Sequence, residues 1–217
     1  MTVTAGSIID AATSILQDAS NTRWSRTFLL SCVNDSQREV VIYRPDASTS
    51  VSDLTLAEGW LQSIPATATR LLEVFANTTG RACTLTKREV LDSIRPAWRS
   101  DTPQDIIKAW VFDERDGRHF EVWPPATTAA SLKCLYSIPP ADCTVESSPI
   151  TIDETFKGPL ISCVLHLAYL RDSADEANKA LSDSFYAKFV QQISGMTESA
   201  MATLPNKAAN TRKDTSQ

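Results

Sequence analysis

The spacing of apolar residues predicts two helices in the last third of the chain. From 160 to 170 all but two residues are apolar, which is typical of a helix with neighbours on several sides. Further on, Leu181, Phe185 and Phe189 recur every four residues and indicate a helix with a single buried face. We expect Gly195 to end this second helix. The two helices therefore form a hairpin.

The N-terminal part of the chain predicts a second pair of helices. Apolar residues recur at helical spacing over 4–19 and again over 26–43. Ser25 stands where it can cap the second of these helices. Pro45 ends it, because proline disfavours helical backbone at the residue before it. We expect this pair to pack with the C-terminal hairpin as one four-helix bundle.

Between the two helix pairs, short β-prone runs and prolines replace the helical periods. The clearest hairpin joins 110–113 to 119–123 through an Asp-Gly turn at Asp116. A third strand over 131–137 is expected to complete an antiparallel sheet with this hairpin. A further strand, 71–75, is expected to pair with 82–85.

One short helix is expected inside this β-rich part. Thr86 and Glu89 have the spacing of a capping box, and the helix would run through Ile94. Val90, Leu91 and Ile94 are expected to cover the sheet.

The fold class predicted from this order is α+β: two helices, a β-rich insertion, then two helices. The predicted segments are an N-terminal helix pair, the insertion, a C-terminal helix pair and an extended tail, at 1–46, 47–151, 152–195 and 196–217. The tail has few large apolar side chains, so we expect it to be disordered unless a partner orders it.

Composition narrows the class of protein. The net charge of −5 disfavours stable binding of DNA by this chain alone, since a DNA-binding groove needs a basic surplus. The five cysteines are widely spaced and form no CxxC pair, so we expect free, mostly buried thiols. No signal peptide or membrane-length apolar run is evident. We expect a soluble protein made in the cytoplasm.

No catalytic, cofactor or metal-binding motif is found, and we predict no enzyme activity and no cofactor. Asp113, Glu114 and Asp116 resemble part of a cation loop, but a solvated hairpin turn is the favoured interpretation. His119 is expected on a strand surface, with a role as a base as the alternative. His166 is expected in the core, bonded to a neighbouring helix, with a proton switch as the alternative.

Five tryptophans are spread along the chain without basic residues around most of them. This spread favours anchoring in cores or subunit interfaces over stacking on nucleic-acid bases. They are Trp24, Trp60, Trp98, Trp110 and Trp123.

An ordered set of short motifs from residue 4 to about 195 resembles the phage adaptor proteins, the ring component between portal and tail in tailed bacteriophages. It is more distantly similar to the tail tubular A proteins of short-tailed phages. No single motif is diagnostic, and the order and spacing carry the resemblance. The motifs include Arg23-Trp24-Ser25, Val33-Asn34-Asp35, Gln37-Arg38-Glu39-Val40, Arg44-Pro45-Asp46-Ala47, Glu58-Gly59, Pro96-Ala97-Trp98, Val122-Trp123-Pro124-Pro125, Tyr136-Ser137-Ile138-Pro139-Pro140 and Arg171-Asp172-Ser173-Ala174.

The resemblance implies a structural virion protein that forms a ring, usually of twelve copies, under the portal. Its partners would be the portal protein and the downstream tail or nozzle protein, and genomic double-stranded DNA would pass through the ring. It also implies that a terminal segment extends onto the portal. Candidate residues for contact with the portal or a neighbouring subunit are Leu204, Pro205, Lys207, Arg212 and Lys213. Candidates for subunit or tail contact are Arg23, Trp24, Trp60, Arg81, Asp116 and Arg118.

Two alternatives remain open at this point. A tail completion or assembly protein would share the helices but bind tail components and ignore the portal. A hydrolase without a known motif would have to use Asp113 and His119.

Overall fold

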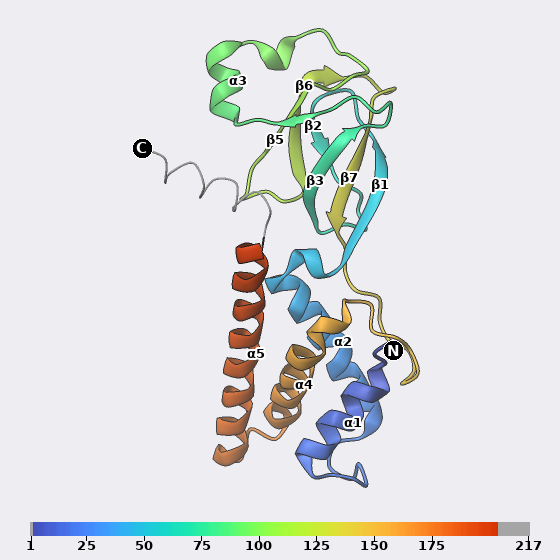
Figure 1. Cartoon of the computed structure of the whole chain (residues 1–217), viewed down its shortest axis with the longest axis vertical. Coiled ribbons are helices and arrows are strands. Elements are labelled where there is room, and N and C mark those ends of the chain that lie inside the picture. Colours follow the sequence, from blue (N-terminus) through green and yellow to red (C-terminus); the bar gives the residue numbers. More distant parts are fainter. Residues whose placement is uncertain (1, 204–217) are drawn as a thin grey trace. The chain divides into compact units, whose positions relative to one another are not determined.

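The computed structural model describes residues 2–203, with side chains through Ser199. Two compact units divide the chain (Figure 1). The helical unit comprises residues up to Ala47 and from Pro140 onward, and the β unit comprises Ser48–Pro139. Over the described residues the structure has five α-helices and two sheets, so the predicted α+β class is confirmed.

The helical unit is arranged around one central helix. Its helices are α1 (Ala5–Leu16), α2 (Arg26–Tyr43), α4 (Lys157–Arg171) and α5 (Glu176–Thr203). Helix α4 packs against α1, α2 and α5 and lies between α1 and α5 in Figure 1. The fully buried core residues include Ile8, Ile9, Leu29, Val33, Leu160, Val164 and Phe189. Four helices thus share one core, and a regular four-helix bundle stays a prediction.

Side-chain caps fix where these helices begin. Ser25 Oγ accepts a hydrogen bond from the Phe28 backbone N–H, which confirms the predicted cap of α2. Thr4 caps α1 in the same way through the N–H of Ser7. Helix α1 ends at Leu16, and the predicted range 4–19 was therefore a few residues too long.

Helix α5 does not end at Gly195, as the sequence suggested, but continues to Thr203. A glycine inside a helix costs only about 1 kcal/mol relative to alanine, so it does not by itself stop one. Met196 supplies a compensating contact because it packs against the helical core. The first eight residues of the predicted extended tail are therefore helical, and the rest lies outside the described residues.

The segment 140–151 belongs to the helical unit, although the sequence analysis assigned it to the β-rich insertion. Arg26 forms two short bonds to the Glu146 carboxylate, 2.7 and 2.6 Å long. Gln37, which is fully buried in α2, accepts a 2.8 Å hydrogen bond from the Thr151 backbone N–H. These contacts join residues more than 100 positions apart, so no local sequence pattern could have predicted them.

Two sheets form the β unit. One has the order β1–β7–β3, from Thr49–Thr55, Ser131–Ser137 and Arg70–Asn77. The other has the order β2–β6–β5–β4, from Gly59–Ser63, His119–Ala126, Ala109–Phe112 and Thr84–Leu85. Buried side chains from both sheets meet in one core, which includes Leu71, Val74, Trp110, Phe120, Val122, Leu132 and Tyr136.

The predicted hairpin is confirmed as β5 and β6, which pair antiparallel with Phe112 opposite Phe120. The third strand was placed correctly along the chain but in the wrong sheet, since β7 lies between β1 and β3. The predicted pairing of 71–75 with 82–85 is reduced to one antiparallel bridge between Ala76 and Ala82, because β4 pairs in parallel with β5. Alternation identifies a strand and its two faces, whereas the partner strand depends on contacts across the whole unit.

Helix α3 (Arg88–Ile94) follows β4 and leads to the 3-10 turn η2 (Trp98–Ser100). Lys87 stands at its N-cap and forms no side-chain cap, so the predicted capping box at Thr86 is wrong. Leu91 is buried, but Val90 and Ile94 are exposed, which corrects the prediction that all three cover the sheet. A helix of only two turns can bury one narrow row of side chains against the sheet below it.

All five cysteines are buried and unpaired, as predicted. Burial raises the pKa of Cys163 to about 11 and that of Cys32 to about 12, which keeps these thiols protonated and unreactive. Over residues 2–203, no helix has the length and apolar character needed to cross a membrane.

We predict that Leu160→Ala lowers the free energy of unfolding by about 2–5 kcal/mol, because Leu160 is fully buried in the central helix. Leu170→Ala is the matched control in the same helix, where the side chain is exposed, and should change stability by less than about 0.5 kcal/mol. Urea unfolding monitored by circular dichroism measures both. Equal losses would contradict a core centred on α4.

Candidate functional site

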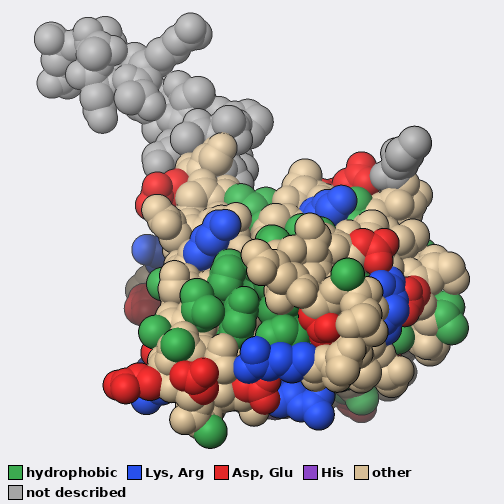
Figure 2. All heavy atoms as spheres, turned by 90° about the horizontal axis from the view of Figure 1, so that it is seen from below, with side chains coloured by type: hydrophobic (Ala, Val, Ile, Leu, Met, Phe, Trp, Pro, Cys, Tyr) green, Lys and Arg blue, Asp and Glu red, His purple; other side chains and the backbone are tan. Residues whose placement is uncertain are grey.

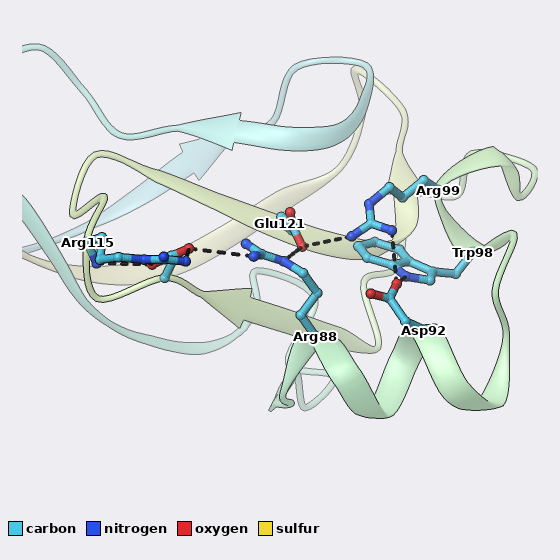
Figure 3. A network of polar contacts seen from close by, with 7 residues as sticks. Arg88, Asp92, Trp98, Arg99, Arg115 and Glu121 are labelled. Carbon is cyan, nitrogen blue, oxygen red and sulfur yellow. Dashed lines mark hydrogen bonds and ion pairs between the residues drawn. The ribbon is translucent and has the colours of Figure 1, made fainter.

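A ladder of alternating charges holds α3 and η2 onto the sheet of the β unit (Figure 3). We call it the arginine ladder. Its central bond joins Arg88 Nε to Glu121 Oε2 at 3.1 Å, and Arg88 also lies 3.5 Å from Asp113. Arg99 lies 2.9 Å from Asp92 and 3.8 Å from Glu121. The ladder thereby connects α3 and η2 to β6 and to the β5–β6 turn. Its members are Arg88, Asp92, Arg99, Asp113, Arg115 and Glu121.

Tryptophans support the ladder from inside the unit. Trp98 is fully buried and donates its indole N–H to Asp92 at 2.8 Å. The Arg99 guanidinium lies 4.3 Å from the centre of the Trp98 ring, close enough for a cation–π contact. Trp60 meets Trp98 edge-on, with 6.3 Å between ring centres. The position of η2 is therefore fixed by packing as well as by charge.

The carboxylates beside this surface are held in the ionised form. A hydrogen bond from Trp98, together with Arg99, lowers the pKa of Asp92. A hydrogen bond from Trp123, together with Arg95, lowers the pKa of Asp101. General acid catalysis needs a raised carboxyl pKa, so these groups are suited to holding structure and not to proton transfer.

The outer side of this clamped segment is apolar and exposed. We call it the α3 face and define it as Leu85, Val90 and Ile94, whose residues are 60%, 42% and 77% exposed. Val90 and Ile94 lie one helical turn apart on the same side of α3. Exposed apolar side chains gathered on a rigid support are typical of surfaces that bind other proteins. The sequence analysis missed this face because it assigned both α3 residues to the core.

A second exposed apolar area lies at the end of the helical unit where α4 turns into α5. Leu170 and Leu181 are both more than 40% exposed there. Figure 2 looks at the unit from this end and shows apolar side chains gathered among acidic and basic ones. Arg23 Nε lies 2.7 Å from Asp172 at the same turn.

The six predicted contact residues of the described chain are divided between the two units. In the helical unit, Trp24 is 3% exposed and donates its indole N–H to the Ala168 carbonyl at 2.9 Å. Arg23, stacked on its ring at 4.5 Å, is the exposed member of that pair. Trp60 in the β unit is half-buried.

The remaining predicted contact residues are exposed on loops of the β unit. Asp116 and Arg118 share the β5–β6 turn, where Asp116 lies 2.8 Å from His119 Nδ1 and Arg118 donates to the Ala68 carbonyl. Arg81 lies on a different connection, between β3 and β4. The predictions for Leu204, Pro205, Lys207, Arg212 and Lys213 fall outside the described residues.

Asp113, Asp116 and His119 all have ion-pair partners within the protein. Asp113 pairs with Arg115 and Arg88, and Asp116 pairs with His119, whose side chain is exposed at the start of β6. Among residues 2–203, no group of three or more acidic, histidine or cysteine side chains could hold a metal ion.

A groove crosses the helical unit between α2 and α5, with α4 as its floor. Its volume is about 270 Å³, and its lining is Asp35, Glu39, Cys163, His166, Leu167 and Tyr186. The Tyr186 hydroxyl donates to Glu39 over 3.5 Å. His166 Nδ1 lies 3.0 Å from the Ser182 carbonyl oxygen, which confirms that this histidine bonds to a neighbouring helix.

Comparison with protein families identifies a match over nearly the whole chain. The family model described as SU10 adaptor protein matches residues 3–212, which include both units. A search of curated proteins returned no match.

We predict that Glu121→Ala destabilises the β unit by about 1–3 kcal/mol, because Glu121 is 8% exposed and Arg88 and Arg99 both lose their shared carboxylate. Glu114→Ala on the exposed β5–β6 turn is the control, with an expected change under about 0.5 kcal/mol. Amide hydrogen exchange should show faster opening of α3 in the Glu121 variant alone. Unchanged exchange in α3 would contradict the clamp.

We also predict that stability falls as the pH drops below about 4, near the pKa of an unfolded aspartate. The pKa values of Asp92, Asp101 and Asp113 are lowered in the folded protein, so their contribution is present above that pH. It is lost as the pH falls through the folded values. Urea unfolding between neutral pH and about pH 3 measures the loss, and Asp101→Asn should make it smaller. A pH profile unaffected by Asp101→Asn would contradict this assignment.

Proposed function

Since the chain belongs to the SU10 adaptor protein family of bacteriophages, we propose that it forms the ring that joins the portal to the tail. The observation that carries the proposal is the match over residues 3–212, since it takes in the helical unit and the β unit together. A phage adaptor is a structural component of the virion. In the proposed ring, about twelve copies stand side by side, with the portal protein on one side and the tail or nozzle protein on the other.

Two features of the helical unit support a ring subunit. Helix α4 is buried on several sides, so the unit is a stable body that can be repeated around an axis. Its exposed apolar residues Leu170 and Leu181 lie at one end, where a neighbouring copy or another ring component would cover them. In the proposed ring, the four helices of each copy form the four-helix bundle predicted from the sequence.

The β unit offers a second contact surface. The arginine ladder fixes α3 before any partner arrives, so little conformational freedom is lost when the α3 face is covered. We assign this face, with Trp60 and the exposed Arg81, Asp116 and Arg118, to contacts with neighbouring copies or with the tail. Arg23 has the same role at the end of the helical unit, with Trp24 as its buried support.

An acidic chain suits the wall of a channel through which double-stranded DNA leaves the capsid. Lys and Arg number 21 against 26 Asp and Glu, a net charge of −5. A strongly basic lining would neutralise phosphates and retain the DNA, whereas this balance lets it slide. The virion protein would be assembled in the host cytoplasm and remain at the junction of portal and tail.

Contact with the portal is assigned to the C-terminal segment. Leu204 and Pro205 follow α5 directly, and Lys207, Arg212 and Lys213 give the segment a basic character. Such a segment can lie on an acidic portal surface or add to the edge of its sheet.

We predict that mixing the full chain with the portal of the same phage adds a ring of density with twelve-fold symmetry, visible by negative-stain electron microscopy. A chain ending at Thr203 keeps all of α5 and should fold but bind the portal more weakly. It is a better truncation than one at Gly195, which would remove the last turns of α5 and the Met196 contact.

The control for that experiment is full-length protein with Lys207, Arg212 and Lys213 changed to Gln. Weakened attachment of both variants would assign the contact to the basic side chains. No ring density with full-length protein, together with binding to tail components, would overturn the portal assignment in favour of a tail completion protein.

A further inference from the structure

The charge of this chain is unevenly distributed. In the helical unit through Thr203, Asp and Glu number 14 and Lys and Arg number 8, a net charge of −6. Residues 204–217 contain three basic side chains and one acidic one, a net charge of +2. A basic segment therefore continues directly from the more acidic of the two units.

The groove between α2 and α5 is where acidic side chains and an open cavity coincide. Asp35 and Glu39 stand one turn apart on α2 at its rim. Asp35 pairs with Arg38 of the same helix at 2.8 Å, so Glu39 is the rim carboxylate for which the described residues supply no basic partner. Tyr186 from α5 forms the opposite wall, and Leu167 and Cys163 contribute an apolar floor. Carboxylates at the rim and an aromatic ring at the wall are the features that receive a lysine or arginine side chain.

Chain length decides which basic residues reach this groove. Tyr186 precedes Thr203 by 17 residues of α5, which at about 1.5 Å per residue is roughly 26 Å along the helix. Ten further residues to Lys213 span at most about 33–36 Å, so Lys213 and its neighbour Arg212 can fold back to the level of Tyr186. Lys207, only four residues beyond Thr203, spans about 14 Å and cannot.

We propose that in the free chain the C-terminal segment folds back along α5 and places Arg212 and Lys213 in the groove of the same copy, against Asp35 and Glu39. This contact is separate from the proposed ring function, because it concerns the chain before any partner binds. The groove then holds the basic segment in one place. Any other acidic surface must compete with the groove for this segment, so the strength of the groove contact determines how easily the segment is transferred.

The test is a zero-length carbodiimide cross-link between lysine amines and carboxylates in the full chain at low ionic strength, read by mass spectrometry. We expect Lys213 joined to Glu39 or Asp35, no such product from Lys207, and loss of the product at high salt. Arg212→Gln leaves the amine and both carboxylates in place and should reduce the product about two- to fivefold, because one of the two basic side chains that hold the segment in the groove is lost. Lys207→Gln, at the basic position too near Thr203 to reach the groove, is the matched control and should leave it unchanged.

Copies labelled with heavy nitrogen and mixed with unlabelled copies identify the source of the segment. Products within one copy support the proposal, and products only between copies overturn it. It is equally overturned if Lys213 couples evenly to acidic residues outside the groove, if Lys207 reaches Glu39 as often, or if Arg212→Gln has no effect. None of these outcomes depends on the portal, so failure of the ring experiment leaves this test intact.

Discussion

Burial of α4 on several sides is the constraint on which the helical unit depends. A helix whose residues are nearly all apolar from Leu160 to Leu170 cannot lie at a surface, so α1, α2 and α5 must pack around it. Its two polar exceptions are satisfied by α5: Ser162 bonds to Gln192 and His166 to Ser182. The groove of the helical unit exists because α2 and α5 flank α4 without closing over it.

In the β unit the main constraint is different, because a short helix must be held at the edge of a small core. Helix α3 has only Leu91 facing inward, too little to keep seven residues in place. The arginine ladder and the buried ring of Trp98 supply the missing contacts. A face that is fixed in advance loses less entropy when a partner covers it than a flexible face does, which suits the proposed place of this chain in a ring.

In the proposed function, the contacts with partners lie on exposed surfaces of both units and on the C-terminal segment. The family match supports this proposal because it includes residues of both units. Carboxylates paired with arginines, buried thiols and a histidine bonded to the next helix all stabilise the body that presents those contacts.

Local sequence signals were enough to predict the existence of the helices, the Ser25 cap, the β5–β6 hairpin and the extent of β7. Each depends on a period or a turn that neighbouring residues define. Three features could be seen only in the tertiary structure. Strand β7 pairs with β1 and β3, the segment 140–151 packs on α2, and α5 continues through Gly195. The tertiary structure also left Val90 and Ile94 exposed, because which row of a short helix is covered depends on its support. Contacts between residues far apart in sequence have no local pattern from which they could be predicted.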